Sequence, residues 1–266
     1  MDHNKRVAEV VHDAISKHEL PPSATNLIVD HPHTSKFYLL PKIHKPGNRG
    51  RPILSACNCP TELLATYLDT ITKLLVENLP SYVKDTNHML DIAYSFRFSG
   101  THNYVFTTDI KSLYTVIPNK DGLLALTHFL NKRNELHPPT HTMLCLTELV
   151  LTINTSSFNG DYYQQTGGVA MGSHFGPKCA CLFVGHIEEQ IFQQYRGKTP
   201  DLYKRYIDDI VGAASGTKEE LEDFATFINK FSSKPEIHLG HLRRQASLPG
   251  SLFHSILQPP HHCYSL

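Results

Sequence analysis

The chain has 266 residues, 40% of them hydrophobic and 19% charged, which suits one sizeable globular domain or two small ones. Lysine plus arginine and aspartate plus glutamate both number 25, so the whole-chain charge gives no argument for a nucleic-acid partner. No stretch approaches the roughly 18 to 20 consecutive apolar residues of a membrane span, and residues 1–20 lack a signal-peptide core, so we expect an intracellular protein with no membrane partner.

The first third of the chain predicts two helices on either side of a hairpin. Residues 5–18 have a helical pattern, and a stronger helix opens at Pro60, with apolar residues at helical spacing. Between them, residues 37–40 and 52–54 are predicted to be extended, and the Pro-Gly-Asn-Arg-Gly run at 46–50 predicts the turn that joins them.

This hairpin is basic. No acidic residue occurs from His31 to Thr61, and the segment contains Lys36, Lys42, Lys45, Arg49 and Arg51. Such a run is either a solvated surface loop or an electrostatic footprint for phosphates.

The rest of the chain mixes helices with short strands. Residues 104–108 (YVFTT) predict a strand that runs into Asp109, and helices are predicted from Asn119, over 144–151 and after Pro177. Strands interleaved irregularly with helices indicate an α+β architecture.

Two short signals add detail to this pattern. Asn159-Gly160 beside aromatic residues predicts a two-residue hairpin turn. Thr217 with Glu220 predicts a capping box at the start of another amphipathic helix.

The six cysteines are expected to be free thiols in a reducing compartment. They include two Cys-x-Cys pairs, a spacing that differs from the Cys-x2-Cys of structural zinc sites. The His-Pro-His and His-His clusters lack a matching ligand set, so no zinc site is predicted.

The stretch YKRYIDDIVG places Asp208 and Asp209 inside a strand-like apolar run. Adjacent side chains of a strand point to opposite faces, so we expect a tight turn between two short strands. Taken alone, the pair fits a plain turn and a metal site about equally well.

If the strand that ends at Asp109 joins the same sheet, three carboxylates converge. Like charges a few ångströms apart raise one another's pKa, so hard, oxygen-seeking Mg²⁺ is the natural occupant. Two such ions would suit in-line nucleotidyl transfer.

These residues carry a resemblance to reverse transcriptases. FTTDIKSLYTVIP resembles motif A of that family, GGVAMGSHFGPKCA resembles motif B, and YIDD is similar to motif C. YLLPKIHK and GRPILSACNCPTELLATYLD resemble the fingers motifs, and all five blocks follow the family's order across residues 37–231. The amino-acid sequences of these five blocks are most similar to those of Penelope-like retroelement polymerases.

The resemblance implies an α+β right-hand polymerase with fingers and palm and with the thumb truncated or absent. It divides the chain into an N-terminal helical extension (1–35), fingers (36–103), a palm with inserted helices (104–237) and a divergent tail (238–266). The tail resembles neither a primer-grip hairpin nor a thumb helix.

The function implied is that of an enzyme, an RNA-directed DNA polymerase (reverse transcriptase) of retroelement origin. Its partners would be an RNA template, a DNA primer and dNTPs, in the nucleus or the cytoplasm. Its cofactors would be two Mg²⁺ ions, with Mn²⁺ as the alternative.

Carried over to this sequence, the resemblance makes Asp109 and Asp208 the principal metal ligands and catalytic residues, with Asp209 beside them. Tyr114, five residues after Asp109, would match the aromatic gate that favours deoxynucleotides; as a residue it fits a core tyrosine equally well. Arg51 would match the fingers arginine that binds the incoming triphosphate, with an ordinary surface arginine as the alternative.

Further contacts come from the same resemblance. Lys42 would bind the nucleotide, and Gly172 would let the backbone approach the nascent base pair. Lys45 and Arg49 would bind the nucleic acid. Each lysine could instead be a solvated side chain, and the glycine a plain turn residue.

Three other interpretations remain open. The chain could be a catalytically inactive, retroelement-derived module that binds nucleic acid, or another templated polymerase of intron type or RNA-making type. It could also be a remnant without function. The three aspartates together favour an enzyme, whereas the missing thumb favours a binding module.

Overall fold

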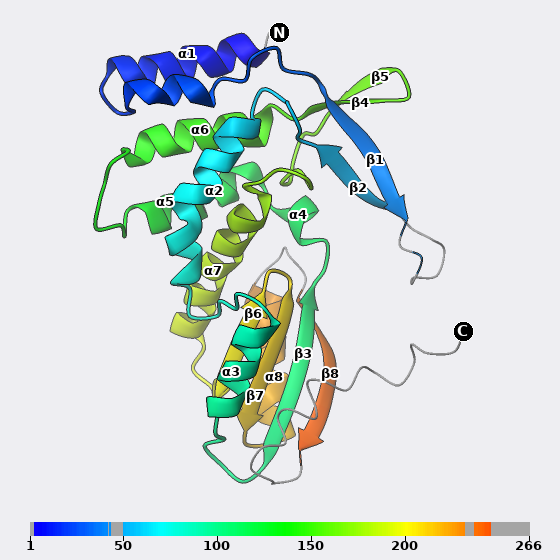
Figure 1. The fold of residues 1–266 in the computed structure, drawn as a ribbon. Helices are drawn as coiled ribbons and strands as arrows, with labels where there is room; N and C mark the ends of the chain where they lie inside the picture. Colours follow the sequence, from blue (N-terminus) through cyan, green and yellow to red (C-terminus); the bar gives the residue numbers. More distant parts are fainter. Residues whose placement is uncertain (1–2, 42, 44–49, 232–236, 246–266) are drawn as a thin grey trace. The chain divides into compact units, whose positions relative to one another are not determined.

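The structure, a computed structural model, describes residues 3–41, 43, 50–231 and 237–245 (Figure 1). The chain divides into two compact units. The first unit comprises residues 1–76 and 114–186, and the second comprises residues 77–113 and 187–266. The predictions for Lys42, Lys45, Arg49 and a missing thumb after β8 fall on residues outside the described ranges.

The first unit combines a small sheet with helices. Its strands lie in the order β2-β1-β4-β5, with bounds β1 (Ser35–Pro41), β2 (Gly50–Ser55), β4 (Thr155–Phe158) and β5 (Asp161–Gln164). Its helices are α1 (His3–Ser16), η1 (Pro22–Leu27), α2 (Glu62–Glu77), α4 (Leu113–Val116), α5 (Asn119–Leu130), α6 (Thr140–Thr152) and most of α7 (Gly176–Gln194). The core is apolar and includes the fully buried Leu64, Leu68, Leu126, Leu130, Met143, Leu146 and Phe175.

Both predicted hairpins form in this sheet. β1 and β2 pair antiparallel, with Leu40 opposite Arg51. β4 and β5 are joined at Asn159 and Gly160, whose φ angles of 52° and 93° are those of the primed turn that the Asn-Gly pair favours. The sequence pattern therefore specified the Asn159-Gly160 turn locally, whereas the predicted turn between β1 and β2 lies mostly outside the described residues.

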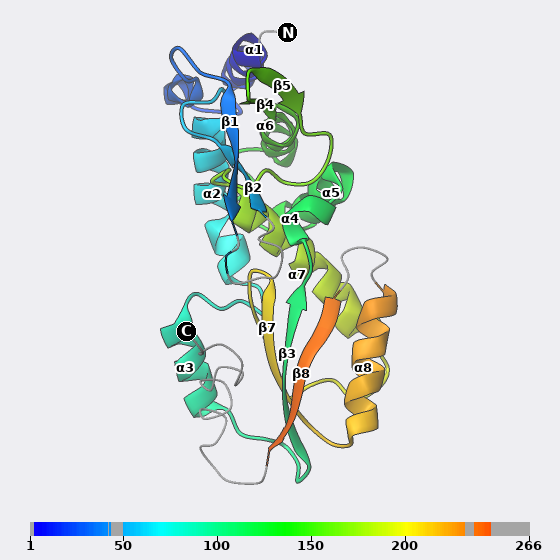
Figure 2. The same ribbon diagram turned by 90° about the vertical axis from the view of Figure 1, so that its right-hand side faces the viewer.

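The second unit is built on an antiparallel sheet in the order β6-β7-β3-β8. Its strands are β3 (Asn103–Ile110), β6 (Leu202–Tyr206), β7 (Asp209–Ser215) and β8 (Ile237–Gln245), and its helices are α3 (Thr86–Ser95) and α8 (Lys218–Phe231). Figure 2 shows α3 over one face of this sheet and α8 over the other. Apart from Ile237, β8 lies in the segment assigned to the divergent tail, where no periodicity predicted a strand.

The period-2 pattern of the central strands explains why both faces are covered. Val105 and Ala213 pack with α3 in one cluster, whereas Phe106 and Ala214 pack with Leu221 of α8 in another. Both faces of the strands are therefore apolar in the middle of the sheet.

Two helix starts have their own caps. The predicted capping box forms: the Glu220 amide donates to Thr217 Oγ1 at 3.2 Å, and the Thr217 amide donates to Glu220 Oε2 at 2.8 Å. Asp85 caps α3 by accepting from the His88 amide at 2.9 Å.

The other composition-based expectations concern thiols and membranes. The cysteines that the structure describes, Cys57, Cys59, Cys145, Cys179 and Cys181, are all free thiols, as predicted. Among the described helices, none combines the length and the apolar character that crossing a bilayer requires.

Candidate active site

Three aspartates meet at one end of the second unit's sheet. Asp109 is the penultimate residue of β3, while Asp208 and Asp209 lie where β6 turns into β7. The turn is short: Tyr206 pairs with Asp209, which leaves only Ile207 and Asp208 between the paired positions. Ile207 has a φ of 55°, so the adjacent carboxylates sit at a tight turn, as the sequence predicted.

The register brings the carboxylates together. Asp109 pairs directly with Asp209, and residues opposite one another in antiparallel strands project from the same face. The Ile110 amide donates to the Asp208 carbonyl at 3.0 Å, which ties the turn to the end of β3. Asp109 and Asp209 are exposed and Asp208 is half-buried, so the cluster is open to solvent.

The electrostatics of the cluster favour a cation. Partial burial raises the pKa of Asp209, and the negative charges of Asp208 and Asp109 raise that pKa further. A bound divalent cation would remove this repulsion, and oxygen ligands of this kind are those that Mg²⁺ and Mn²⁺ prefer. The donor set therefore fits the metal chemistry that the sequence predicted.

The residues predicted to contact the nucleotide belong to the first unit. Arg51 lies exposed on β2, and Tyr114 lies in α4, where its carbonyl accepts from the Val169 amide at 2.7 Å. A Cβ built at Gly176 would lie 3.7 Å from Tyr114 Cε1, so the half-buried ring packs beside the start of α7.

Gly172 has a packing role that the sequence did not reveal. Its φ is 123°, and a side chain there would collide with the carbonyl of Leu54 on β2. The neighbouring Met171 carbonyl accepts from the Leu54 amide at 2.8 Å, so this loop is anchored to β2. The close approach that the glycine permits is therefore, at the least, an approach to β2.

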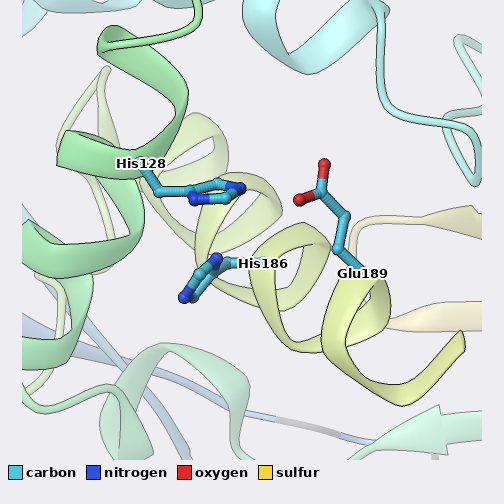
Figure 3. A group of neighbouring side chains, drawn as sticks. All are labelled: His128, His186 and Glu189. Atoms are coloured by element: carbon cyan, nitrogen blue, oxygen red, sulfur yellow. The ribbon is translucent and has the colours of Figure 1, made fainter. Parts of the chain in front are cut away.

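Two histidines that the sequence analysis did not single out lie together in the first unit. The ring centroids of His128 in α5 and His186 in α7 are 4.4 Å apart (Figure 3). Glu189 follows His186 by three residues on α7, so the helical repeat places both on one side of that helix. Histidine and carboxylate side chains can bind transition metals. However, the His186 ring also lies edge-on to Phe129 of α5, with ring centroids 6.5 Å apart, so the packing of rings between α5 and α7 is enough to bring the two histidines together.

The fold and the carboxylate cluster define a class. An antiparallel sheet with helices on both faces, which presents one aspartate at a strand end and two at the adjoining hairpin turn, is the arrangement of a right-hand polymerase palm.

The family comparison is more specific. The model of the reverse transcriptase (RNA-dependent DNA polymerase) family matches residues 43–241, so the chain belongs to that family. A search of curated proteins found no match.

Several solved structures have a similar fold. Apo telomerase from Candida tropicalis, truncated from its C-terminal domain, is 15% identical with a TM-score of 0.54, over 82% of this chain and 51% of that one. The telomerase of the same organism in complex with a TWJ fragment of telomeric RNA is 12% identical with a TM-score of 0.58, over 88% and 44%. The RNA-dependent RNA polymerase of BmCPV at its elongation state is 12% identical with a TM-score of 0.55, over 88% and 22%. This chain thus spans about half the length of the telomerase chains and less of the viral one.

Proposed function

We propose that this chain is an RNA-directed DNA polymerase of retroelement origin, related most closely to Penelope-like elements. The observation that carries the proposal is the convergence of Asp109, Asp208 and Asp209 at the end of one sheet, in a chain of the reverse transcriptase family. The Penelope-like assignment rests only on the amino-acid sequences of the five motif blocks.

In this proposal the three carboxylates hold two divalent cations, Mg²⁺ or Mn²⁺. When bound, these ions would lower the pKa of a primer 3′-hydroxyl and stabilise the charge of the leaving pyrophosphate. Asp109 would contribute from β3 and Asp208 from the turn, while Asp209 adds negative charge beside them. The hairpin turn gives the chain a short, fixed support for two adjacent ligands.

The first unit would supply the contacts to the nucleotide and the template. Arg51, exposed on a strand next to β1, can offer a planar fork of donors to a triphosphate. Lys42 would contact the same nucleotide, and Lys45 and Arg49 would contact the nucleic-acid backbone. Tyr114 would restrict the space at the sugar 2′ position.

The substrates would be an RNA template, a DNA primer and dNTPs, and such chemistry takes place in the nucleus or the cytoplasm. The telomerase neighbour in complex with telomeric RNA supports an RNA partner for this fold. Because the chain spans only part of those neighbours, its activity by itself belongs to the proposal.

Primer extension on an RNA template with Mg²⁺ and labelled dNTPs tests the proposal. The wild type is expected to extend the primer, whereas Asp208→Asn is expected to bind the primed template and leave it unextended. Asp91→Asn, which removes an exposed carboxylate of α3 in the same unit, serves as the matched control and should retain activity.

Two outcomes would contradict the proposal. If the folded wild type binds the template but never extends the primer, the chain is the inactive binding module. If Asp208→Asn loses template binding together with extension, the carboxylate has a structural role.

A further inference from the structure

A buried charge lies three residues before Asp208. Arg205 of β6 is 3% exposed and Glu188 of α7 is 6% exposed, and both belong to the second unit. Arg205 Nε donates to Glu188 Oε1 at 2.7 Å, and Arg205 Nη2 donates to Glu188 Oε2 at 3.0 Å. Burial of two charges is costly, and such a pair is seldom more stable than apolar residues of the same volume. Its presence therefore calls for a role besides stability.

Further contacts fix both ends of this pair. Ser81, itself buried, donates through Oγ to Glu188 Oε2 at 2.6 Å. The Arg205 amide donates to the Ser81 carbonyl at 2.7 Å, and the Val83 amide donates to the Arg205 carbonyl at 3.1 Å. The backbone of Arg205 is thus fixed by hydrogen bonds to Ser81 and Val83. Its guanidinium is held by the Glu188 carboxylate, which Ser81 in turn anchors.

The remaining arm of the guanidinium reaches the turn of the active site. Arg205 Nη1 donates to the carbonyl of Ile207 at 2.9 Å. Ile207 is a β-branched residue at a φ of 55°, a conformation that such residues rarely adopt and that persists only where the surroundings hold it. Its carbonyl belongs to the peptide group that leads into Asp208, so the contact holds the backbone that orients the catalytic carboxylate.

We infer that Arg205, locked by Glu188 and Ser81, is a positioning residue that clamps the β6–β7 turn and so holds Asp208 beside Asp109. This inference rests on the proposed function, because it assigns the clamp to the same site. A planar guanidinium serves Glu188 and Ile207 at once, whereas a lysine ammonium is a point donor that lacks this fixed geometry. Arg205→Lys keeps the charge and therefore isolates the geometry.

Hydrogen exchange of the metal-free protein tests the clamp without any need for activity. In Arg205→Lys and in Glu188→Gln, amides of the peptide covering residues 203–212 are expected to exchange about tenfold faster than in the wild type, because a local opening becomes easier. Lys204→Ala is the matched control: this neighbouring cation bonds the Pro80 carbonyl at 2.7 Å but not the turn, so its exchange should match the wild type. Glu188→Gln keeps the shape of the pair and covers the case in which Arg205→Lys fails to fold.

Two patterns of hydrogen exchange would contradict the proposed clamp. Wild-type exchange rates at the turn in both variants would overturn the inference. A rise spread evenly over α3, α8 and the turn would also overturn it, since that pattern describes a merely structural ion pair.

Metal titration connects the clamp to the site. The Mn²⁺ concentration for half-maximal binding, followed by electron paramagnetic resonance, is expected to rise about tenfold or more in Arg205→Lys and Glu188→Gln, as for other residues that orient metal ligands. The KM for dNTP should stay unchanged. Unaltered Mn²⁺ affinity in variants with a loosened turn would refute the link to Asp208. A wild type that binds no Mn²⁺ would instead refute the proposed function, and the exchange experiment would still decide whether Arg205 clamps the turn.

Discussion

The carboxylate cluster of the second unit and the predicted nucleotide contacts of the first unit differ in their effect on folding stability. The aspartate cluster opposes folding, because partial burial, and beside it the charges of Asp208 and Asp109, raise the pKa of Asp209. Gly172 and Tyr114, in contrast, have packing roles against Leu54 and the start of α7. A group that costs stability needs a functional explanation, whereas a group that packs well does not. The assignment of the cluster is therefore stronger than that of the contacts.

The largest effect is expected when the cluster loses a member. Asp109→Asn should lower primer extension by about a thousandfold or more, because it removes a charged metal ligand, and each 1.4 kcal/mol of lost transition-state stabilisation costs a factor of ten. Without divalent cations the same change should raise the free energy of unfolding by up to about 1 kcal/mol, since like charges directly opposite in a sheet destabilise it. Activity assays and urea unfolding check the two parts, and a large loss of stability would mean that Asp109 supports the fold.

Gly172→Ala is expected to lower the stability of the first unit, without a direct effect on nucleotide incorporation. The new methyl group would collide with the Leu54 carbonyl and force an alanine to a φ of 123°, so we expect a loss of roughly 2–4 kcal/mol in the free energy of unfolding. Gly167→Ala, where a Cβ has nothing within 4 Å, is the control and should change little. Normal stability with reduced dNTP incorporation would instead support the contact with the nascent base pair.

The sequence predicted those parts of the molecule that local patterns determine. The strand that ends at Asp109, the turn at Asp208 and Asp209, and the Asn159-Gly160 hairpin follow from residue types within a few positions. The register that sets Asp109 opposite Asp209 could be expected only as a consequence of one shared sheet.

The missed features depend on contacts between distant segments. The clamp at Arg205 joins residues 81, 188 and 205, and no spacing in the sequence indicates that they meet. β8 has no steady alternation and is recognised only through its pairing with β3. The packing of Gly172 against Leu54 likewise depends on a loop and a strand that are far apart in the chain.

Arg51→Ala tests the triphosphate contact that is predicted for the first unit. Removal of a charge-assisted phosphate contact worth roughly 1.5–3 kcal/mol should raise the KM for dNTP by about 10- to 150-fold, with kcat changed less. Lys36→Ala removes another exposed cation of the same hairpin and should leave the KM near that of the wild type. Steady-state kinetics measure both, and equal KM values in the two variants would place Arg51 outside the nucleotide site.

The smallest effect is expected at Tyr114, where the packing role and the proposed gate make different predictions. If the ring limits space at the sugar, Tyr114→Ala should reduce discrimination against ribonucleotides by about tenfold, because exclusion by shape alone is worth only 1–3 kcal/mol. Tyr114→Phe keeps the ring and should retain full selectivity. Competition between dNTP and rNTP in primer extension measures this ratio, and urea unfolding of the same variants measures the contribution of the ring to stability.

Two outcomes in Tyr114→Ala distinguish the roles of the ring. Lower stability with unchanged selectivity would mean that the ring only packs beside α7, whereas loss of selectivity at near-normal stability would make it the gate. The Tyr114 carbonyl that accepts from the Val169 amide is a backbone group that neither substitution removes, so a difference between the two variants is expected to come from the ring.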